Sequence, residues 1–227
     1  MNNIKTNIER FLNKLEYSVN ISGRKSSEVK LVAVTKTVDV EKINMAIESG
    51  IKIIGENKVQ EFLTKLPQLE ECEKHFIGSL QTNKVKQIAD KIDLFHSLDR
   101  IELLDTLDKN GERLNKKIET LIQINIAKEP TKGGVLPEEI EEFCEKVAEK
   151  RWINVKGLMA LPKAENKDQS RKYFALVREM LERLEKQNYN NCNFVELSMG
   201  MSQDYEQAVA EGATYIRIGS ALFGERV

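Results

Sequence analysis

Eight short apolar segments, separated by longer stretches with helical periodicity, recur along the 227-residue chain and constrain its fold more than any other feature. Several are nearly continuous apolar runs, which is typical of strands buried on both faces of a parallel sheet. The predicted strands are 30–36, 51–56, 75–79, 92–97, 120–126, 154–161, 193–199 and 214–220. This alternation predicts an α/β fold, a single closed (β/α)8 TIM barrel, with an open doubly wound sheet as the second choice.

An amphipathic segment before the first predicted strand supports closure of the barrel. Its apolar residues Ile4, Ile8, Phe11, Leu12 and Leu15 share one face of a helix. Little sequence follows the eighth predicted strand, which would be the neighbour of strand one in a closed barrel, so this helix can cover the gap. No linker or change of composition interrupts the chain. We therefore expect one domain over residues 1–227, with an extra N-terminal helix.

Charge and composition exclude several functional classes. The formal net charge of −1 gives no electrostatic basis for general binding to nucleic acid or anionic membranes. No apolar run has the length of a membrane span, and the N-terminus lacks the apolar core of a signal peptide. Cys72, Cys144 and Cys192 are widely spaced, and the chain has only two histidines. We predict reduced thiols, a cytoplasmic protein and no metal site.

The functional residues of such barrels lie at the C-terminal ends of the strands and in the loops that follow. Glycines and serines follow the last two predicted strands, in SMGMS (198–202) and IGSALFG (218–224). Barrels often bind a phosphate there, on backbone N–H groups that no side chain covers. The alternative is that these glycines only form tight turns.

Two cationic side chains are expected near the same end of the barrel. Arg217 lies between two isoleucines and on the opposite face, so it either points into the barrel towards a ligand or forms an internal salt bridge with a carboxylate such as Glu196. Lys36 ends the first strand, where a lysine is commonly a solvated end. Opposite a phosphate site, its amine can form a Schiff base with a phosphate-bearing aldehyde. The residues alone allow pyridoxal 5'-phosphate (PLP) or a sugar phosphate on an aldolase-type lysine.

A family resemblance over nearly the whole chain favours PLP. The motifs that carry it are AVTKT (33–37), GENKVQE (55–61), HFIGSLQTNK (75–84), HSLDR (96–100), TKGG (131–134), GLMAL (157–161), LSMGMSQDYEQAVAEGAT (197–214) and RIGSALFG (217–224). In these motifs the chain resembles the pyridoxal-phosphate homeostasis proteins, the YggS/PROSC-type family. The resemblance implies the fold of the N-terminal barrel of bacterial alanine racemase.

The resemblance also implies a set of cofactor-binding residues. Lys36 would hold PLP covalently as a Schiff base, Asn57 would lie beside the ring, and Arg217 would face the pyridine nitrogen. Lys132 would be a secondary contact. The residues implied at the phosphate are Ser198, Gly219 and Ser220, with the backbone at Met199, Gly200 and Met201.

The resemblance implies a PLP-binding protein of intracellular PLP homeostasis, not an enzyme. An arginine at the pyridine nitrogen disfavours ring protonation and weakens the cofactor as an electron sink, although the racemases are similar in this respect. Racemisation needs acid–base groups on both faces of the substrate, and neither Tyr205 nor Tyr215 is a convincing second base. A slow PLP-dependent amino-acid racemase is the alternative, and a lysine-dependent sugar-phosphate lyase is third. We expect a monomer that binds PLP, with apo-PLP enzymes as candidate partners.

Overall fold

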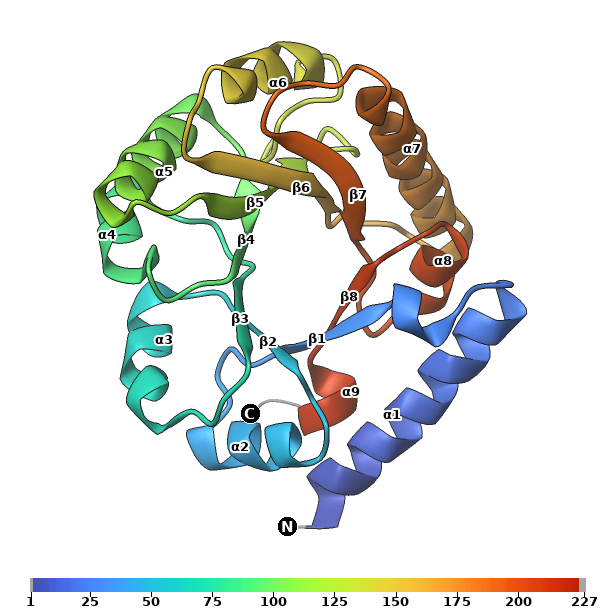
Figure 1. Cartoon of the computed structure of the whole chain (residues 1–227). Helices are drawn as coiled ribbons and strands as arrows, with labels where there is room; N and C mark the ends of the chain where they lie inside the picture. The colour runs from blue at the N-terminus through green and yellow to red at the C-terminus, as the bar shows by residue number, and fades with distance from the viewer. Residues whose placement is uncertain (1, 225–227) are drawn as a thin grey trace.

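The computed structural model describes residues 2–224 and contains a closed barrel of eight parallel strands (Figure 1). The strands pair in chain order, and the eighth returns to pair with the first. They are β1 (Lys30–Val34), β2 (Ile53–Glu56), β3 (Glu73–Phe76), β4 (Leu94–Leu98), β5 (Ile118–Ile124), β6 (Ile153–Ala160), β7 (Cys192–Ser198) and β8 (Tyr215–Ile218). The predicted TIM barrel is confirmed.

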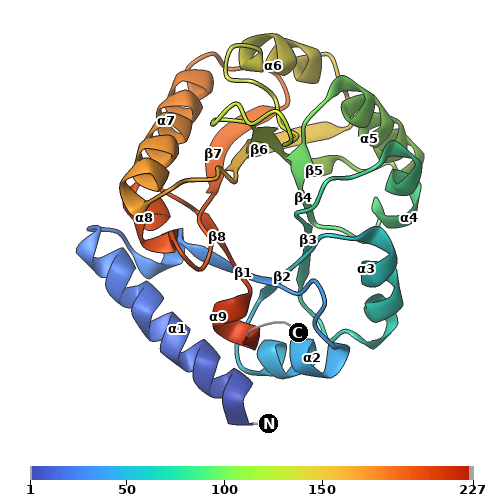
Figure 2. The ribbon, with the colours of Figure 1, turned by 180° about the vertical axis from the view of Figure 1, so that it is seen from behind.

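The helices form an outer ring around the strands, which both views down the barrel show (Figures 1 and 2). They are α1 (Asn2–Ile21), α2 (Val40–Glu48), α3 (Val59–Lys65), α4 (Val85–Ile88), α5 (Ile101–Leu114), α6 (Ile140–Ala148), α7 (Lys167–Glu185), α8 (Tyr205–Ala210) and α9 (Ser220–Phe223), with 3₁₀ turns at Ser26–Glu28, Leu66–Gln68 and Thr82–Lys84. Within residues 2–224, none of the helices has both the length and the apolar character that a bilayer span requires.

The N-terminal helix α1 covers the region where β1 meets β8, as predicted. It packs against α2, α8 and α9, and Asn7 Nδ2 donates to Leu222 O of α9 at 3.3 Å. Ile8 and Phe11 are buried on this face. The prediction was wrong for Leu12, which is 37 % exposed because it lies at the margin of the apolar face, beside a cavity of about 400 Å³.

The side chains of the strands contribute to two apolar cores, one between the barrel and its helices and one inside the barrel. Ala33, Ile216 and Ile218 belong to the large core between strands and helices, which the alternation of side chains along a strand requires. Val32 and Tyr215 belong to a smaller cluster with one residue from each of six strands, which lies on the opposite face, inside the barrel. The interior thus receives alternate residues of β1 and β8.

All eight strands differ from their predicted bounds by one to three residues, and β3 and β4 are two examples. β3 ends at Phe76, before the predicted 79, because the chain bends where Gly78 packs on the backbone of Asn57. A Cβ atom on Gly78 would lie 2.3 Å from Asn57 O, so only glycine fits this contact. β4 continues one residue beyond the predicted end, to Leu98, and His96 within it has no exposed surface.

Candidate functional site

A cavity of about 830 Å³ opens at the C-terminal ends of the strands. Its lining combines residues that are far apart in the sequence, from the end of β1, the loop after β5, the segment 161–170, the loop after β7 and the end of β8. Six predicted site residues line it: Lys36, Lys132, Met201, Arg217, Gly219 and Ser220. Among the described residues, the lining does not include Asn57, Ser198, Met199 or Gly200.

Arg217 is buried beneath this cavity and faces the barrel interior, as its position between Ile216 and Ile218 predicts. Its Nη1 donates to Ser198 Oγ at 2.6 Å and its Nη2 to Ala160 O at 2.9 Å. Burial lowers the pKa of the guanidinium to about 10, with an opposing effect of Asp204. The side chain therefore remains a charged donor at neutral pH.

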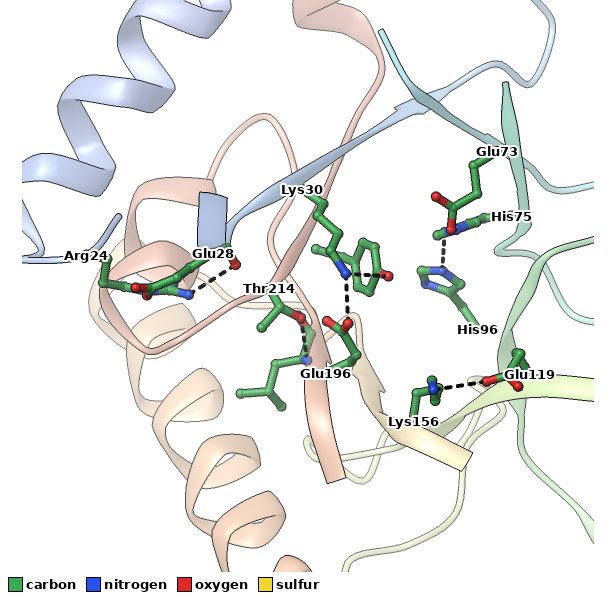
Figure 3. A network of polar contacts seen from close by, with 12 residues as sticks. Arg24, Glu28, Lys30, Glu73, His75, His96, Glu119, Lys156, Glu196 and Thr214 are labelled. Carbon is green, nitrogen blue, oxygen red and sulfur yellow. Dashed lines mark hydrogen bonds and ion pairs between the residues drawn. The ribbon is translucent and has the colours of Figure 1, made fainter. Parts of the chain in front are cut away.

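The alternative prediction, an internal salt bridge between Arg217 and Glu196, is wrong. Glu196 Oε1 pairs with Lys30 Nζ at 2.8 Å, and Lys30 also donates to Tyr215 Oη at 3.1 Å (Figure 3). Both contacts lie where β1 and β8 begin, at the end of the barrel opposite the cavity. Arg217 remains paired only with uncharged acceptors among residues 2–224.

A chain of hydrogen bonds inside the barrel supports Arg217 from below. Ser198 Oγ is 2.9 Å from His96 Nδ1, His96 Nε2 is 2.8 Å from His75 Nδ1, and His75 Nε2 is 2.7 Å from Glu73 Oε1. The lower part of this chain is visible in Figure 3. With Arg217 it joins five residues, which come from β3, β4, β7 and β8.

The chain has one consistent direction of donation. An arginine can only donate, so Ser198 Oγ accepts from Arg217 and gives its own proton to His96 Nδ1. His96 then donates from Nε2 to His75 Nδ1, and His75 donates from Nε2 to the Glu73 carboxylate. With two neutral imidazoles every ring nitrogen has a partner, and the one donor proton of the Ser198 hydroxyl is used within this chain of hydrogen bonds. The predicted role of Ser198 at a phosphate remains a prediction.

The buried imidazole of His96 makes stability depend on pH. Burial, followed by the effects of His75 and Arg217, holds its pKa well below the usual value. Below about pH 6.5 the unfolded chain takes up a proton here that the folded protein does not, so stability falls as the pH decreases, by up to about 1.4 kcal/mol per pH unit. Urea denaturation at pH 7.5 and 5.5 should show a smaller decrease for His96→Gln than for the wild type. Equal decreases would contradict this assignment.

The residues predicted at the phosphate fall into two groups. The hydroxyls of Ser202 and Ser220 lie 3.4 Å apart, on the two loops that follow β7 and β8. The N–H groups of Met199 and Met201 are used within the fold, since they donate to Tyr215 O at 3.1 Å and to Asp204 Oδ1 at 2.7 Å.

Gly200 has a packing reason to be glycine. Its φ is +89°, and a Cβ atom would lie 2.5 Å from Ala208 Cβ of α8. The loop can thus approach α8 closely only without a side chain here. The positive φ and this close approach support the alternative interpretation, in which Gly200 is a glycine for reasons of backbone conformation and packing.

Lys132 and Asn57 occupy different positions relative to the cavity. Lys132 lines it and is held by Glu129 Oε1 at 3.0 Å and by Leu161 O at 2.9 Å. Asn57 lies just after β2, and its Oδ1 is buried without a hydrogen-bond partner among the described residues. The same stretch of the chain, residues 2–224, holds no group of three or more His, Cys, Asp or Glu side chains that could bind a metal ion.

Sequence reasoning missed the two histidines that support Arg217 and the buried Lys65, whose Nζ donates to the carbonyl of Thr35, the residue before Lys36. His75 and His96 offered a signal, since each is a polar residue within an apolar strand. Lys65 offered a weaker one, because an isolated lysine at the end of a helix usually faces solvent, whereas this one is buried.

Comparisons with known proteins identify the family of this chain. Residues 11–227 match the family model described as the alanine racemase N-terminal domain. A pyridoxal phosphate homeostasis protein of Aquifex aeolicus is 43 % identical over 222 residues, 96 % of each chain. A protein of the same name from Escherichia coli K12 is 35 % identical over 231 residues, 100 % of this chain and 98 % of its own.

Solved structures of similar fold include a PLP-bound protein and an alanine racemase. PipY of Synechococcus elongatus, solved with PLP bound, is 31 % identical with a TM-score of 0.80, covering 92 % of this chain and 99 % of PipY. An alanine racemase of Clostridium difficile has a TM-score of 0.75 at 14 % identity, covering 97 % of this chain and 57 % of the racemase, which shows a shared fold alone. The chain therefore belongs to the alanine racemase N-terminal domain family and, within it, to the pyridoxal phosphate homeostasis proteins.

Proposed function

We propose that this protein binds PLP at the C-terminal mouth of its barrel, holds it as a Schiff base on Lys36, and serves PLP homeostasis without substantial catalytic turnover. One observation carries the proposal: Lys36 and Arg217 line the same cavity as Gly219 and Ser220. An amine, a fixed cationic donor and a wall of small polar residues are thereby brought together. The family membership of the chain supports the same function.

The residues present fit this cofactor. The cavity volume is within the usual range of about 300–1,000 Å³ for small-molecule sites. Lys36 is exposed, and within residues 2–224 no hydrogen bond or ion pair occupies its Nζ. The Ser202 and Ser220 hydroxyls can donate to a phosphate, and Lys163 and Lys167 add positive charge at the same cavity.

Each proposed residue has a defined task. Lys36 would hold the cofactor covalently through its Nζ, with the aldehyde oxygen lost as water. When bound, PLP supplies a reactive aldehyde conjugated to an electron-accepting pyridine ring. Arg217 would face the ring nitrogen as a donor that keeps its own proton, and would thereby disfavour the protonated ring that strong electron withdrawal needs. Asn57, Ser198 and Lys132 are proposed to support the ring and the pocket walls.

The arrangement gives no support to racemisation. Tyr205 is buried, with its ring 5.1 Å from that of Phe11 and away from the cavity. Tyr215 lies where β8 begins and bonds Lys30 at the opposite end of the barrel. Among the described residues, neither tyrosine lines the cavity, so neither supplies a second acid–base group to a substrate bound there.

The proposal extends to the state and location of the protein. We propose a single barrel domain that works as a monomer in the cytoplasm and exchanges PLP with apo-PLP enzymes. The large exposed apolar residues are scattered over separate elements, such as Tyr17 on α1, Ile101 on α5 and Leu176 on α7. The three free cysteines suit a reducing compartment.

A combined spectral and chiral assay tests the function. Purified protein is loaded with PLP, freed of excess cofactor, and incubated separately with L- and D-alanine. We expect the visible-range absorption of the bound cofactor to persist, and no interconversion of enantiomers above that of free PLP, because neither Tyr205 nor Tyr215 lines the cavity. A colourless protein would contradict cofactor binding, and turnover above the control would favour the slow racemase instead.

A further inference from the structure

Lys65, at the end of α3, is a buried lysine with all three of its N–H donors in use. Its side chain is 10 % exposed, and its Nζ lies 2.7 Å from Glu56 Oε1, 2.7 Å from Glu61 Oε1 and 2.8 Å from Thr35 O. Glu56 is itself 1 % exposed. Burying the Lys65–Glu56 pair is costly unless close contacts and additional hydrogen bonds offset the loss of hydration.

The hydrogen bonds of this cluster converge on the two residues that flank Lys36. Before it, the carbonyl of Thr35 accepts a hydrogen bond from Lys65 Nζ, and the hydroxyl of Thr35 donates to Glu56 Oε1 at 2.7 Å. After it, the backbone N–H of Thr37 donates to Glu61 Oε1. The backbone is thus fixed immediately before and immediately after the lysine that is proposed to bind the cofactor.

Thr37 shows why such fixing is needed. Its φ is +58°, a left-handed conformation that is unfavourable for a β-branched residue. The turn is closed by Val38 N, which donates to Thr35 O at 3.0 Å. The bond from Thr37 N–H to Glu61 therefore stabilises a turn that the local sequence disfavours.

Glu61 is held in the charged form that this contact requires. Burial alone would raise the pKa of its carboxyl group. The hydrogen bonds from Lys65 and from the Thr37 backbone have the opposite sign and prevail, so the pKa lies below its usual value. Both oxygen contacts are made by Oε1, which links the backbone after Lys36 to the ammonium group of Lys65.

We propose that Glu61 and Lys65 are positioning residues for Lys36: together with Glu56 they hold a strained turn that aims the amine into the cavity. This inference rests on the proposed function, in which Lys36 forms the Schiff base. With its flanking peptides fixed, Lys36 has fewer backbone conformations to lose when the covalent bond forms. Among the described residues, Glu56, Glu61 and Lys65 form no hydrogen bond or ion pair with Arg217, Gly219 or Ser220. These three side chains should therefore affect the covalent step and not the fit of the cofactor.

Glu61 is the residue to vary, because its side chain is 21 % exposed and its loss leaves the buried Glu56–Lys65 pair intact. Glu61→Ala removes the acceptor for Thr37 N–H, whereas Glu61→Gln keeps an amide oxygen there. Glu141→Ala is the matched control, since Glu141 lies on the far helix α6 and its loss removes a carboxylate from an exposed ion pair with Arg183 of α7.

The experiment compares two ligands on the full chain. PLP can form the Schiff base, while pyridoxine 5'-phosphate has an alcohol in place of the aldehyde and reports the fit alone. For Glu61→Ala we expect the rate of Schiff-base formation, followed by visible absorption and by borohydride trapping, to fall roughly tenfold or more. Pyridoxine 5'-phosphate should bind as to the wild type. Glu61→Gln should recover part of the rate, and Glu141→Ala should match the wild type for both ligands.

The outcomes separate this inference from the proposed function. A wild-type protein that forms no Schiff base on Lys36 would overturn the function itself. A wild type that forms it, with Glu61→Ala reacting at the same rate, would overturn only the positioning role. Equal weakening of both ligands in Glu61→Ala would also overturn it, because the damage would then lie in the cavity and not in the aim of Lys36.

Discussion

Replacement of Lys36 by alanine is expected to abolish the visible-range absorption of protein that has been loaded with PLP and freed of excess cofactor. Among the cavity lysines, Lys36 follows the end of β1, and its Nζ has no protein partner within residues 2–224. Without the covalent bond, only the phosphate and ring contacts remain. We expect the apparent affinity for PLP to fall on the order of 100-fold, about 3 kcal/mol, in a spectral or fluorescence titration.

Lys163 provides the matched control. It lines the same cavity, and its backbone N–H donates to Glu129 Oε1, a contact that Lys163→Ala preserves. This variant should keep the absorption band, with a modest loss of affinity from the reduced positive charge. A full band in Lys36→Ala, or its loss in Lys163→Ala, would assign the Schiff base to another lysine.

Substitution of Gly157 by alanine is expected to have the largest effect on folding. Gly157 lies in β6, where the pairing with both neighbouring strands changes register, and its φ is +157°. A Cβ atom there would lie 1.9 Å from Glu196 O and 2.7 Å from the carbonyl carbon, so β6 and β7 would have to separate. We expect a loss of at least about 3 kcal/mol in the free energy of unfolding by urea denaturation.

Gly212→Ala separates backbone strain from steric contact. Gly212 has a φ of +93°, but its nearest neighbour would lie 3.5 Å from an added Cβ atom. This variant should therefore lose only the cost of the left-handed conformation, about 1–2 kcal/mol. If the two variants are equally destabilised, the contact between β6 and Glu196 does not limit the stability of the barrel.

The fold was predictable because each strand carries its own signal. Apolar runs such as 51–56 and 154–161 are typical of strands that helices cover in a parallel sheet. Their regular alternation with helical segments leaves few possible topologies. The ends of the strands were less certain. β3 stops early because Gly78 must approach the backbone of Asn57, and no local pattern reveals a contact with a neighbouring strand.

The site was predictable only in part. Lys36, Gly219 and Ser220 follow strand ends, and the closed topology brings all such positions to one mouth. The partners of Arg217 were not predictable, since Glu196 was as plausible as Ser198 until the pairing of β7 with β8 was known. The same holds for the cluster around Lys65, whose members are joined by tertiary contacts and share no spacing rule.

The closure of the barrel also sets the order in which the protein can acquire its ligand during synthesis. Lys36 emerges from the ribosome early, but the cavity also needs Arg217, Gly219 and Ser220, and α1 needs Leu222 of α9 as a packing partner. At ordinary rates of translation the delay is on the order of ten seconds or more. A nascent chain therefore carries the reactive lysine without its pocket, and the ability to retain cofactor arises only when the last strand docks beside the first.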